Sequence, residues 1–275
     1  MIKRMSDISR HMAWLEDYLH DSAFSSPFCD RERILSVSGK ADHVLLGAYQ
    51  GERLAGIFCL MVLEDEKTIE TIFLYCRDRE PYEELMAYLS EHYGGYEVWF
   101  VFNPQNHVLK SCLSARNAFF YAEQRFMEYR GGTLSDTEEI IPYCAAYREE
   151  YIRIHNDEGY WNGEKVLERL DDFDVFLCVR DGRLVGYADL SKGAELVEIM
   201  DIWILPEYRN QGIGALLLRK AIVSVSGKRL ILTVDVDNDA ANHLYEKLGF
   251  REIAWNNCVT ARLTVAPAAP PPCGD

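Results

Sequence analysis

The alternation of apolar and polar positions divides the chain into two similar halves. Each half opens with two apolar strands joined by a tight glycine-containing turn, over residues 45–56 and again over 176–186. An apolar strand, a helix, a second strand and a short helix then follow in the same order in both halves. The expected ranges are 68–76, 81–93, 96–102 and 106–116 in the first half, and 196–205, 214–224, 229–236 and 240–248 in the second. This alternation predicts an α/β (α+β) fold with two lobes, each a mixed, mostly antiparallel, twisted sheet flanked by helices.

The length of the chain is sufficient for two domains of ordinary size, because 275 residues can bury two separate cores. The pair Gly131-Gly132 lies between the two halves and predicts a boundary there. We therefore expect one domain over residues 1–130 and another over 131–265. Residues 266–275 read APAAPPPCGD, which predicts a frayed, Pro-rich tail.

The net charge of −15 argues against a nucleic-acid partner, because binding to phosphates needs a positive surface. Two interpretations of the surplus carboxylates stay open: they promote solubility, or they attract a cationic amine. Charges interrupt every apolar stretch of residues 1–20, and no run of 18 apolar residues occurs elsewhere, so neither a signal peptide nor a membrane span is predicted. Eight scattered cysteines without a C-x-x-C pair indicate reduced thiols, no metal site and a cytoplasmic location.

A glycine-containing loop joins the strand that ends near Pro206 to an amphipathic helix. The loop reads Arg209-Asn210-Gln211-Gly212-Ile213-Gly214. Glycines let the backbone approach a ligand closely, and the unpaired N–H groups at the start of a helix attract anions. An ATPase loop is absent, and position 217 is Leu, so a dinucleotide fingerprint is absent as well. The glycines alone are equally compatible with a plain strand-to-helix turn.

The flanking residues resemble the GCN5-related N-acetyltransferase (GNAT) family, whose signature is Arg/Gln-x-x-Gly-x-Gly/Ala after a strand. Arg209, Gly212 and Gly214 match it. The segment from Asn238 to Phe250 is similar to the family pattern N-x-x-A-x-x-x-Y-x-x-x-G-F at every specified position. This resemblance covers about residues 174–253, whereas the first half resembles the family only in the order of its elements.

The resemblance implies an acetyl-CoA site without a metal. The strand backbone over Ile202 to Ile204 would splay at a bulge and bind the pantetheine arm, and the loop amides would hold the pyrophosphate. The implied cofactor-binding residues are Ile202, Trp203, Ile204, Arg209, Asn210, Gln211, Gly212, Ile213, Gly214, Ala215, Asn238 and Tyr245. By the same resemblance, the Ile204 amide polarises the thioester carbonyl and Tyr245 is the general acid for the departing thiolate.

Acetyl transfer also needs a base for the amine, and the resemblance places that carboxylate at Glu198. Strand periodicity predicts that Glu198 shares a face with Ile202 and Ile204, and that Asp201 points to the opposite face. Asp235 and Asp237 are reserve candidates that would act through water. For each of these residues, a solvated or ion-paired side chain is the alternative.

The first half carries neither part of this machinery. Where the second half has its glycine loop, residues 74–83 contain no glycine and three acidic side chains, which would repel a diphosphate. Ser111 or Cys112 stands near the position that corresponds to Tyr245. We interpret residues 1–130 as a degenerate GNAT-like lobe that supports the other one. In the second half, the acids and aromatics of Asn156 to Trp161 either form a wall for a cationic acceptor or pack in the core.

The sequence therefore predicts an N-acetyltransferase that moves an acetyl group from acetyl-CoA to a primary amine by direct attack in a ternary complex. The amine belongs to a small molecule or a peptide. Two alternatives are an acyl-CoA-binding sensor without turnover and an interaction scaffold without affinity for CoA.

Overall fold

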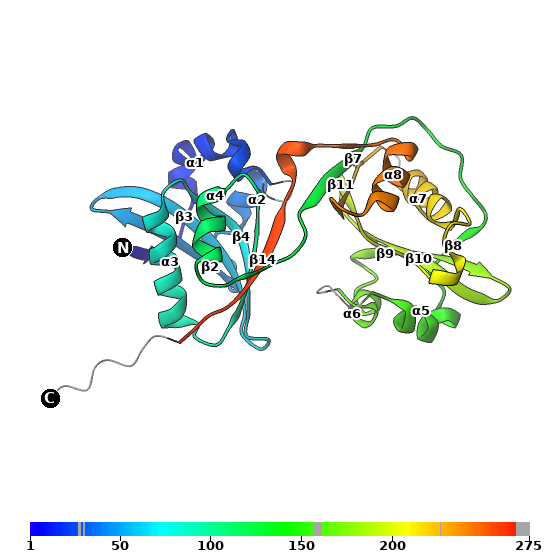
Figure 1. Cartoon of the computed structure of the whole chain (residues 1–275), viewed down its shortest axis with the longest axis horizontal. Coiled ribbons are helices and arrows are strands. Elements are labelled where there is room, and N and C mark those ends of the chain that lie inside the picture. The colour runs from blue at the N-terminus through cyan, green and yellow to red at the C-terminus, as the bar shows by residue number, and fades with distance from the viewer. Residues whose placement is uncertain (27–28, 30, 157–160, 226, 268–275) are drawn as a thin grey trace. The chain divides into compact units, whose positions relative to one another are not determined.

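The computed structural model describes residues 1–26, 29, 31–156, 161–225 and 227–267, which form two compact units (Figure 1). Unit 1 comprises residues 1–124 and 254–275, and unit 2 comprises residues 125–253. Each unit contains one mixed sheet of seven strands. The predicted α/β fold with two sheet-and-helix lobes is confirmed.

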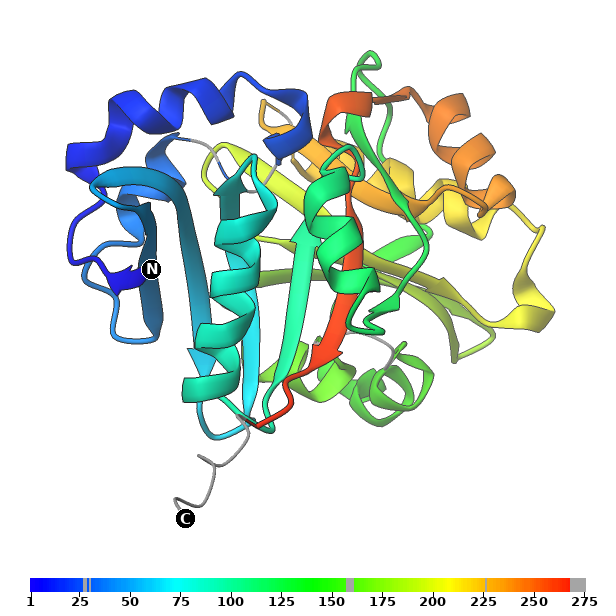
Figure 2. The same ribbon diagram turned by 60° about the vertical axis from the view of Figure 1, so that its left-hand side comes forward.

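The sheet of unit 1 has the strand order β1-β2-β3-β4-β5-β14-β6. Helices α3 and α4 pack on one of its faces (Figure 2), and α1 and α2 pack on the other. The strands are β1 (Ile2–Arg4), β2 (His43–Gln50), β3 (Arg53–Leu63), β4 (Thr68–Cys76), β5 (Glu97–Phe102), β6 (Phe119–Phe120) and β14 (Val259–Thr264). The helices are α1 (Met12–Leu19), α2 (Arg31–Ser36), α3 (Arg79–His92) and α4 (His107–Ser114), with 3₁₀ turns η1 (Ser9–His11), η2 (Ser22–Phe24) and η5 (Ala254–Asn256).

The sheet of unit 2 has the order β13-β7-β12-β11-β10-β9-β8. One of its faces packs against α7, and the other against α5 and α6. The strands are β7 (Gln124–Tyr129), β8 (Ile140–Pro142), β9 (Phe173–Arg180), β10 (Arg183–Ser191), β11 (Leu196–Ile204), β12 (Arg229–Asp235) and β13 (Phe250–Glu252). The helices are α5 (Arg148–Ile154), α6 (Gly163–Glu168), α7 (Ile213–Ser224) and α8 (Asp239–Leu248), with 3₁₀ turns η3 (Ala145–Tyr147) and η4 (Pro206–Tyr208).

The two sheets exchange a strand. β7 follows the elements of unit 1 along the chain but lies beside β12 in the second sheet, and β14 follows the elements of unit 2 but pairs with β5 in the first. When the strands of the first sheet are counted from β1 and those of the second from β8, the two orders correspond strand by strand. β14 in the first sheet then occupies the same place as β7 in the second. The internal duplication predicted from the sequence is therefore present at the level of topology.

The predicted domain limits differ from these units in two places. The predicted boundary near residue 130 follows β7, whereas the chain passes from unit 1 to unit 2 at residue 125. The predicted second domain also includes residues 254–265, which belong to unit 1 because β14 completes its sheet. The hydrophobic periodicity of a strand does not specify which sheet the strand joins, so the exchange cannot be predicted from the sequence pattern. From residue 268 onward, the expected tail lies outside the described residues.

The predicted hairpins and the elements after them match closely. β2 turns into β3 at Gly51, and β9 turns into β10 through Asp181 and Gly182, which both have positive φ as a tight two-residue turn requires. Within the described residues, no helix has the length and apolar character needed to cross a membrane.

Candidate active site

The strands β11 and β12 pair over only part of their length. They run parallel from Leu196 to Ile199 of β11 and then separate, although β11 continues to Ile204. On its other edge β11 stays paired with β10, and the Leu205 amide donates to the Val185 carbonyl at 2.9 Å. Because the bonds of an antiparallel ladder alternate, the N–H groups of Ile202 and Ile204 face the gap that β12 leaves. The gap is therefore lined by main-chain donors and acceptors that no neighbouring strand uses.

A bulge at Met200 changes which side chains of β11 share a face. Asp201 pairs with Asp189 and Ile199 pairs with Leu190, so Met200 is the extra residue. Val197 and Ile199 before the bulge, and Ile202 and Ile204 after it, all pack in the core beneath α7.

Glu198 and Asp201 consequently lie on the same face, toward α5 and α6, where Trp203 also packs. The prediction that Glu198 shares a face with Ile202 and Ile204 is wrong, because strict alternation fails across a bulge. The prediction that Asp201 points to the opposite face from Glu198 fails for the same reason.

The two glycines of the loop serve different purposes. Gly212 is the N-cap of α7 with a φ of 83°, a left-handed conformation that other residues rarely adopt. A Cβ atom at Gly214 would lie 3.0 Å from Leu244 Cδ2 and 3.3 Å from Ile204 Cδ1. Gly214 therefore lets α7 begin in close contact with both α8 and β11.

The amides at the start of α7 are available to a ligand. In the described part of the chain, none of the N–H groups of residues 210–215 donates to a protein acceptor; the first amide that does is that of Leu216, to the Gly212 carbonyl at 3.2 Å. These unpaired donors coincide with the positive end of the helix dipole. The arrangement is an anion-binding site of the kind that holds phosphate groups.

Arg209 braces the strand before the loop. Its Nε donates to the Ile204 carbonyl at 3.1 Å, and its guanidinium lies 4.8 Å from the centre of the Trp203 ring. These contacts occupy the Ile204 carbonyl and leave the Ile204 amide as the free polar group at the end of β11.

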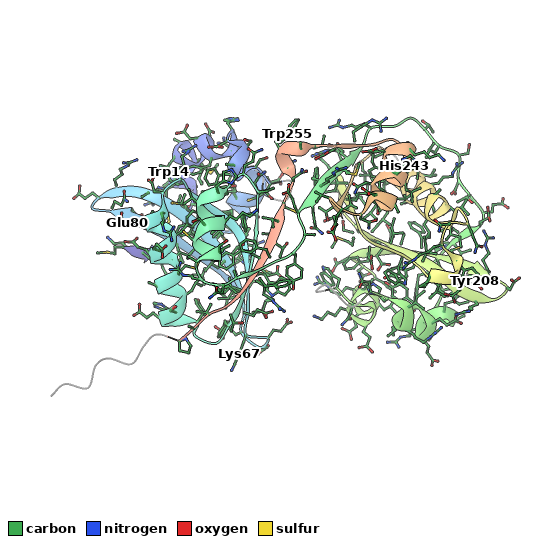
Figure 3. The ribbon with its side chains drawn as sticks, viewed as in Figure 1. Trp14, Lys67, Glu80, Tyr208, His243 and Trp255 are labelled. Atoms are coloured by element: carbon green, nitrogen blue, oxygen red, sulfur yellow. The ribbon has the colours of Figure 1, made fainter. Side chains whose placement is uncertain are left out.

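A cavity of about 540 Å³ joins the gap, the loop and α8. Ten of the predicted cofactor-binding residues line it, and Gln211 and Tyr245 do not. Tyr208, whose position Figure 3 shows, lines it as well, together with three residues of α8 that the sequence analysis did not identify. The full set is Ile202, Trp203, Ile204, Tyr208, Arg209, Asn210, Gly212, Ile213, Gly214, Ala215, Asn238, Ala240, Ala241 and Leu244.

Helix α8 is fixed at both ends by its own sequence. The Asn238 side chain accepts from the Ala241 amide at 3.2 Å, and Gly249 ends the helix with a φ of 108°. The buried Asn242 donates to the carbonyls of Asp235 and Asn238, which holds the loop after β12. Neither reserve carboxylate, Asp235 or Asp237, lines the cavity.

The two predicted catalytic side chains have strongly shifted acidities. Burial raises the pKa of Glu198 to about 7. Burial, and after it the charge of Asp201, raises the pKa of Tyr245 to about 12. The Tyr245 hydroxyl makes no hydrogen bond within the described protein, while its ring packs 5.9 Å from that of Phe250. At neutral pH, Glu198 is therefore close to half ionised and Tyr245 is protonated.

Unit 1 has the same framework, but its cavity is filled. β4 and β5 also pair in parallel over only three residues of each strand, yet the space between them is about 30 Å³ and is lined by Phe24 and Ser25. The Asn103 side chain donates to the Trp255 carbonyl at 2.8 Å, and Ser25 Oγ donates to Asn256 Oδ1 at 2.6 Å.

Two further features of unit 1 oppose a diphosphate. Helix α3 begins after Asp78 with Glu80 in its first turn, so negative charge occupies the place of the glycine loop. Asn106 caps α4 as Asn238 caps α8, and Leu113 and Tyr245 stand seven residues after their respective caps. The tyrosine equivalent is therefore the buried Leu113, rather than Ser111 or Cys112.

The sequence analysis missed a polar cluster on the α5 and α6 face, formed by Tyr151, His155, Tyr187, Asp189 and Asp201. An aspartate in the otherwise apolar strand β10 was the signal that could have revealed it. Of the predicted acceptor wall, residues 157–160 lie outside the described residues. Trp161 packs edge-on against Phe173 at 4.8 Å, as the alternative interpretation predicted.

Comparison with known proteins agrees with this geometry. The profile of the acetyltransferase (GNAT) family matches residues 141–250, which include the glycine loop, the strands that separate and α8. Unit 2 therefore contains a domain that matches the GNAT family. Enzymes of this family are acyltransferases that use acetyl-CoA as their co-substrate.

Among GNAT relatives, the chain is 29% identical over 171 residues to an uncharacterised N-acetyltransferase of Methanocaldococcus jannaschii. The aligned region covers 54% of this chain and 75% of the relative. It has the fold of a GCN5-related N-acetyltransferase from Sphaerobacter thermophilus, with a TM-score of 0.66, 14% identity and coverage of 98% and 97%. A tandem GNAT protein from the clavulanic acid biosynthesis pathway matches with a TM-score of 0.61, 13% identity and coverage of 98% and 99%.

Proposed function

We propose that unit 2 transfers the acetyl group of acetyl-CoA to a primary amine by direct attack, and that unit 1 does not bind the cofactor. The observation that carries this proposal is the cavity of about 540 Å³ whose floor is a run of unpaired amides at the start of α7. The amides of residues 210–215 would hold the diphosphate, and the open edge of Ile202 and Ile204 would bind the pantetheine amides as an added strand does.

The reaction needs one proton acceptor and one proton donor. The amine nitrogen attacks the thioester carbonyl carbon, whose developing negative oxygen would be stabilised by the Ile204 amide. Glu198 takes the proton from the nitrogen, the C–S bond breaks, and Tyr245 protonates the departing thiolate. The acidities fit these roles, since Glu198 is poised near neutral pH and the buried surroundings of Tyr245 also raise the basicity of the thiolate.

An acyl-enzyme route has less support. Cys178, the buried thiol of β9, is fully shielded from solvent and its pKa is raised by burial, so it is neither accessible nor ionised. Direct attack in a ternary complex is the simpler route because it needs no nucleophile from the protein.

Replacing Ala215 with proline tests the diphosphate site. The Ala215 amide lies in the first turn of α7 and has no protein partner, so proline removes a donor to the ligand without breaking a helix hydrogen bond. A charge-assisted hydrogen bond contributes about 1.5 to 3 kcal/mol, so the Kd for acetyl-CoA should rise about tenfold or more. Isothermal titration calorimetry measures the change, with Ala215→Ser as the matched variant that keeps the amide. A folded Ala215→Pro protein with unchanged affinity would contradict the assignment.

The stoichiometry tests the division of labour between the units. Calorimetry should give one acetyl-CoA bound per chain, because the corresponding space in unit 1 is about 30 Å³ and helix α3, which follows β4, has an acidic first turn. Two sites per chain would disprove the proposal that unit 1 is degenerate.

The amine is identified by measuring thiol release over polyamines, aminoglycosides, amino acids and peptides. Acetylation of one class supports the enzyme. Tight binding of acetyl-CoA with no turnover across the panel would favour the sensor instead, and no binding at all would favour the scaffold.

A further inference from the structure

Two carboxylates face each other on the face of the unit 2 sheet that α5 and α6 cover. Asp189 of β10 and Asp201 of β11 are direct register partners, and both lie on the face that α5 covers. Like charges directly opposite one another destabilise a sheet. The pair must therefore be compensated by other groups.

His155, directly after α5, compensates Asp189. Its Nε2 lies 2.9 Å from Asp189 Oδ2, and each of the two side chains is 1% exposed. The Tyr151 hydroxyl donates to the same oxygen at 2.7 Å. Burial lowers the pKa of His155, but the hydrogen bond and charge of Asp189 outweigh it and leave that pKa above its ordinary value. Burial also raises the pKa of Asp189, although the hydrogen bonds of His155 and Tyr151 oppose that rise, so His155 and Asp189 titrate as one coupled pair.

Asp201 has no such cation. Its Oδ2 accepts from the Tyr187 hydroxyl at 2.5 Å, and among the described residues no lysine, arginine or histidine nitrogen lies within 4.0 Å of it. The Tyr187 hydroxyl is itself held by the Asn156 amide at 2.9 Å, and its ring stacks on His155 at 4.8 Å. Tyr187 and the backbone amide of Ile202 thus donate to the Asp201 carboxylate, while no cationic side chain pairs with it at ion-pair distance.

The position of Asp201 places this charge at the reacting centre. It directly precedes Ile202, where β11 opens toward the cavity, and its charge acts on Tyr245 across the gap. Glu198 lies on the same face, on the other side of the bulge. The described titratable groups that act on Asp201 are Tyr187, Asp189 and His155, and the charge of Asp201 acts in turn on Tyr245.

From this geometry we propose that Asp201 anchors the acceptor amine as an ammonium ion, and that Tyr187, backed by the Asp189–His155 pair, positions the Asp201 carboxylate. The inference rests on the proposed function and narrows the acceptor to amines that arrive protonated. The bound ammonium loses one proton to Glu198, and the resulting neutral nitrogen attacks the thioester. The nitrogen loses its second proton as the amide forms, and this proton replaces the one that Tyr245 gives to the departing thiolate. The two carboxylates thus divide the work: Asp201 binds the cation and Glu198 takes the proton.

The test compares ethylamine, which is an ammonium ion at neutral pH, with hydroxylamine, which is neutral. Breaking a partly buried ion pair with the acceptor should raise the KM of Asp201→Asn for ethylamine about 30-fold. Its KM for hydroxylamine should change by less than about threefold, because a neutral acceptor has no charge to pair. Tyr187→Phe keeps the carboxylate and should raise the KM for ethylamine by a smaller factor.

Asp174→Asn is the matched control, because it removes the same charge from β9 at an exposed site that pairs with Lys192. The Kd for acetyl-CoA is measured for every variant as a control for folding and for the proposed function. It should equal the wild-type value in each case. The inference is overturned if Asp201→Asn raises both KM values equally or neither, or if the wild type does not prefer ethylamine. A wild type that fails to bind acetyl-CoA would overturn the proposed function itself.

Discussion

Glu198→Gln is expected to slow acetyl transfer by about 100-fold or more, since a positioned general base contributes about 100- to 10,000-fold to the rate. The Kd for acetyl-CoA should stay the same, because Glu198 does not line the cavity. In the wild type, kcat/KM should rise with pH through about 7 as Glu198 ionises. In the variant, kcat/KM should no longer rise with pH through about 7. A variant profile that kept this rise would show that another group is the base.

The same substitution should stabilise the protein. Burial raises the pKa of Glu198 from 4.5 to about 7, so between these values the folded state binds more protons than the unfolded state. The contribution of Glu198 to the free energy of unfolding therefore falls as the pH rises through this window. Above pH 7, ionisation of the buried Glu198 lowers that free energy by at most ~3 kcal/mol. Glutamine stays neutral, so thermal unfolding should show a higher Tm for the variant above pH 7 and an equal Tm near pH 4.5. An equal Tm at every pH would mean that Glu198 ionises freely.

Tyr245→Phe is expected to lower kcat by about 100-fold, because the thiolate loses its proton donor. Acetyl-CoA binding should change little, since Tyr245 does not line the cavity. The fold should be kept, because the hydroxyl has no partner in the described protein and the ring keeps its contact with Phe250.

Single-turnover thiol release measures the effect of Tyr245→Phe separately from product release. Tyr143→Phe is the control, since it removes a phenol oxygen from the same unit beside Tyr151 rather than beside α8. If Tyr245→Phe turned over at the wild-type rate, the general acid would have to be water. If it lost both turnover and cofactor affinity, Tyr245 would be a binding residue.

Local sequence determined most of the proposed cofactor site. The order of strands and helices follows from apolar periodicity. A glycine at position 212 indicates a left-handed backbone there, because few other residues adopt that conformation. Asn238 and Gly249 likewise mark the ends of α8 through interactions within a few residues. The anion site at the start of α7 is also local, since it consists of main-chain amides that any helix leaves unpaired.

Only the tertiary structure decided which side chains meet on the face that α5 and α6 cover. One extra residue at Met200 reverses the alternation of β11 and brings Glu198 and Asp201 to one face, a change that periodicity cannot anticipate. The partners of Asp201 come from β10 and from the end of α5, far away in the chain. The exchange of β7 and β14 between the sheets is equally non-local. The sequence of a strand does not determine which sheet edge it pairs with, because that choice depends on which edge the rest of the fold leaves open.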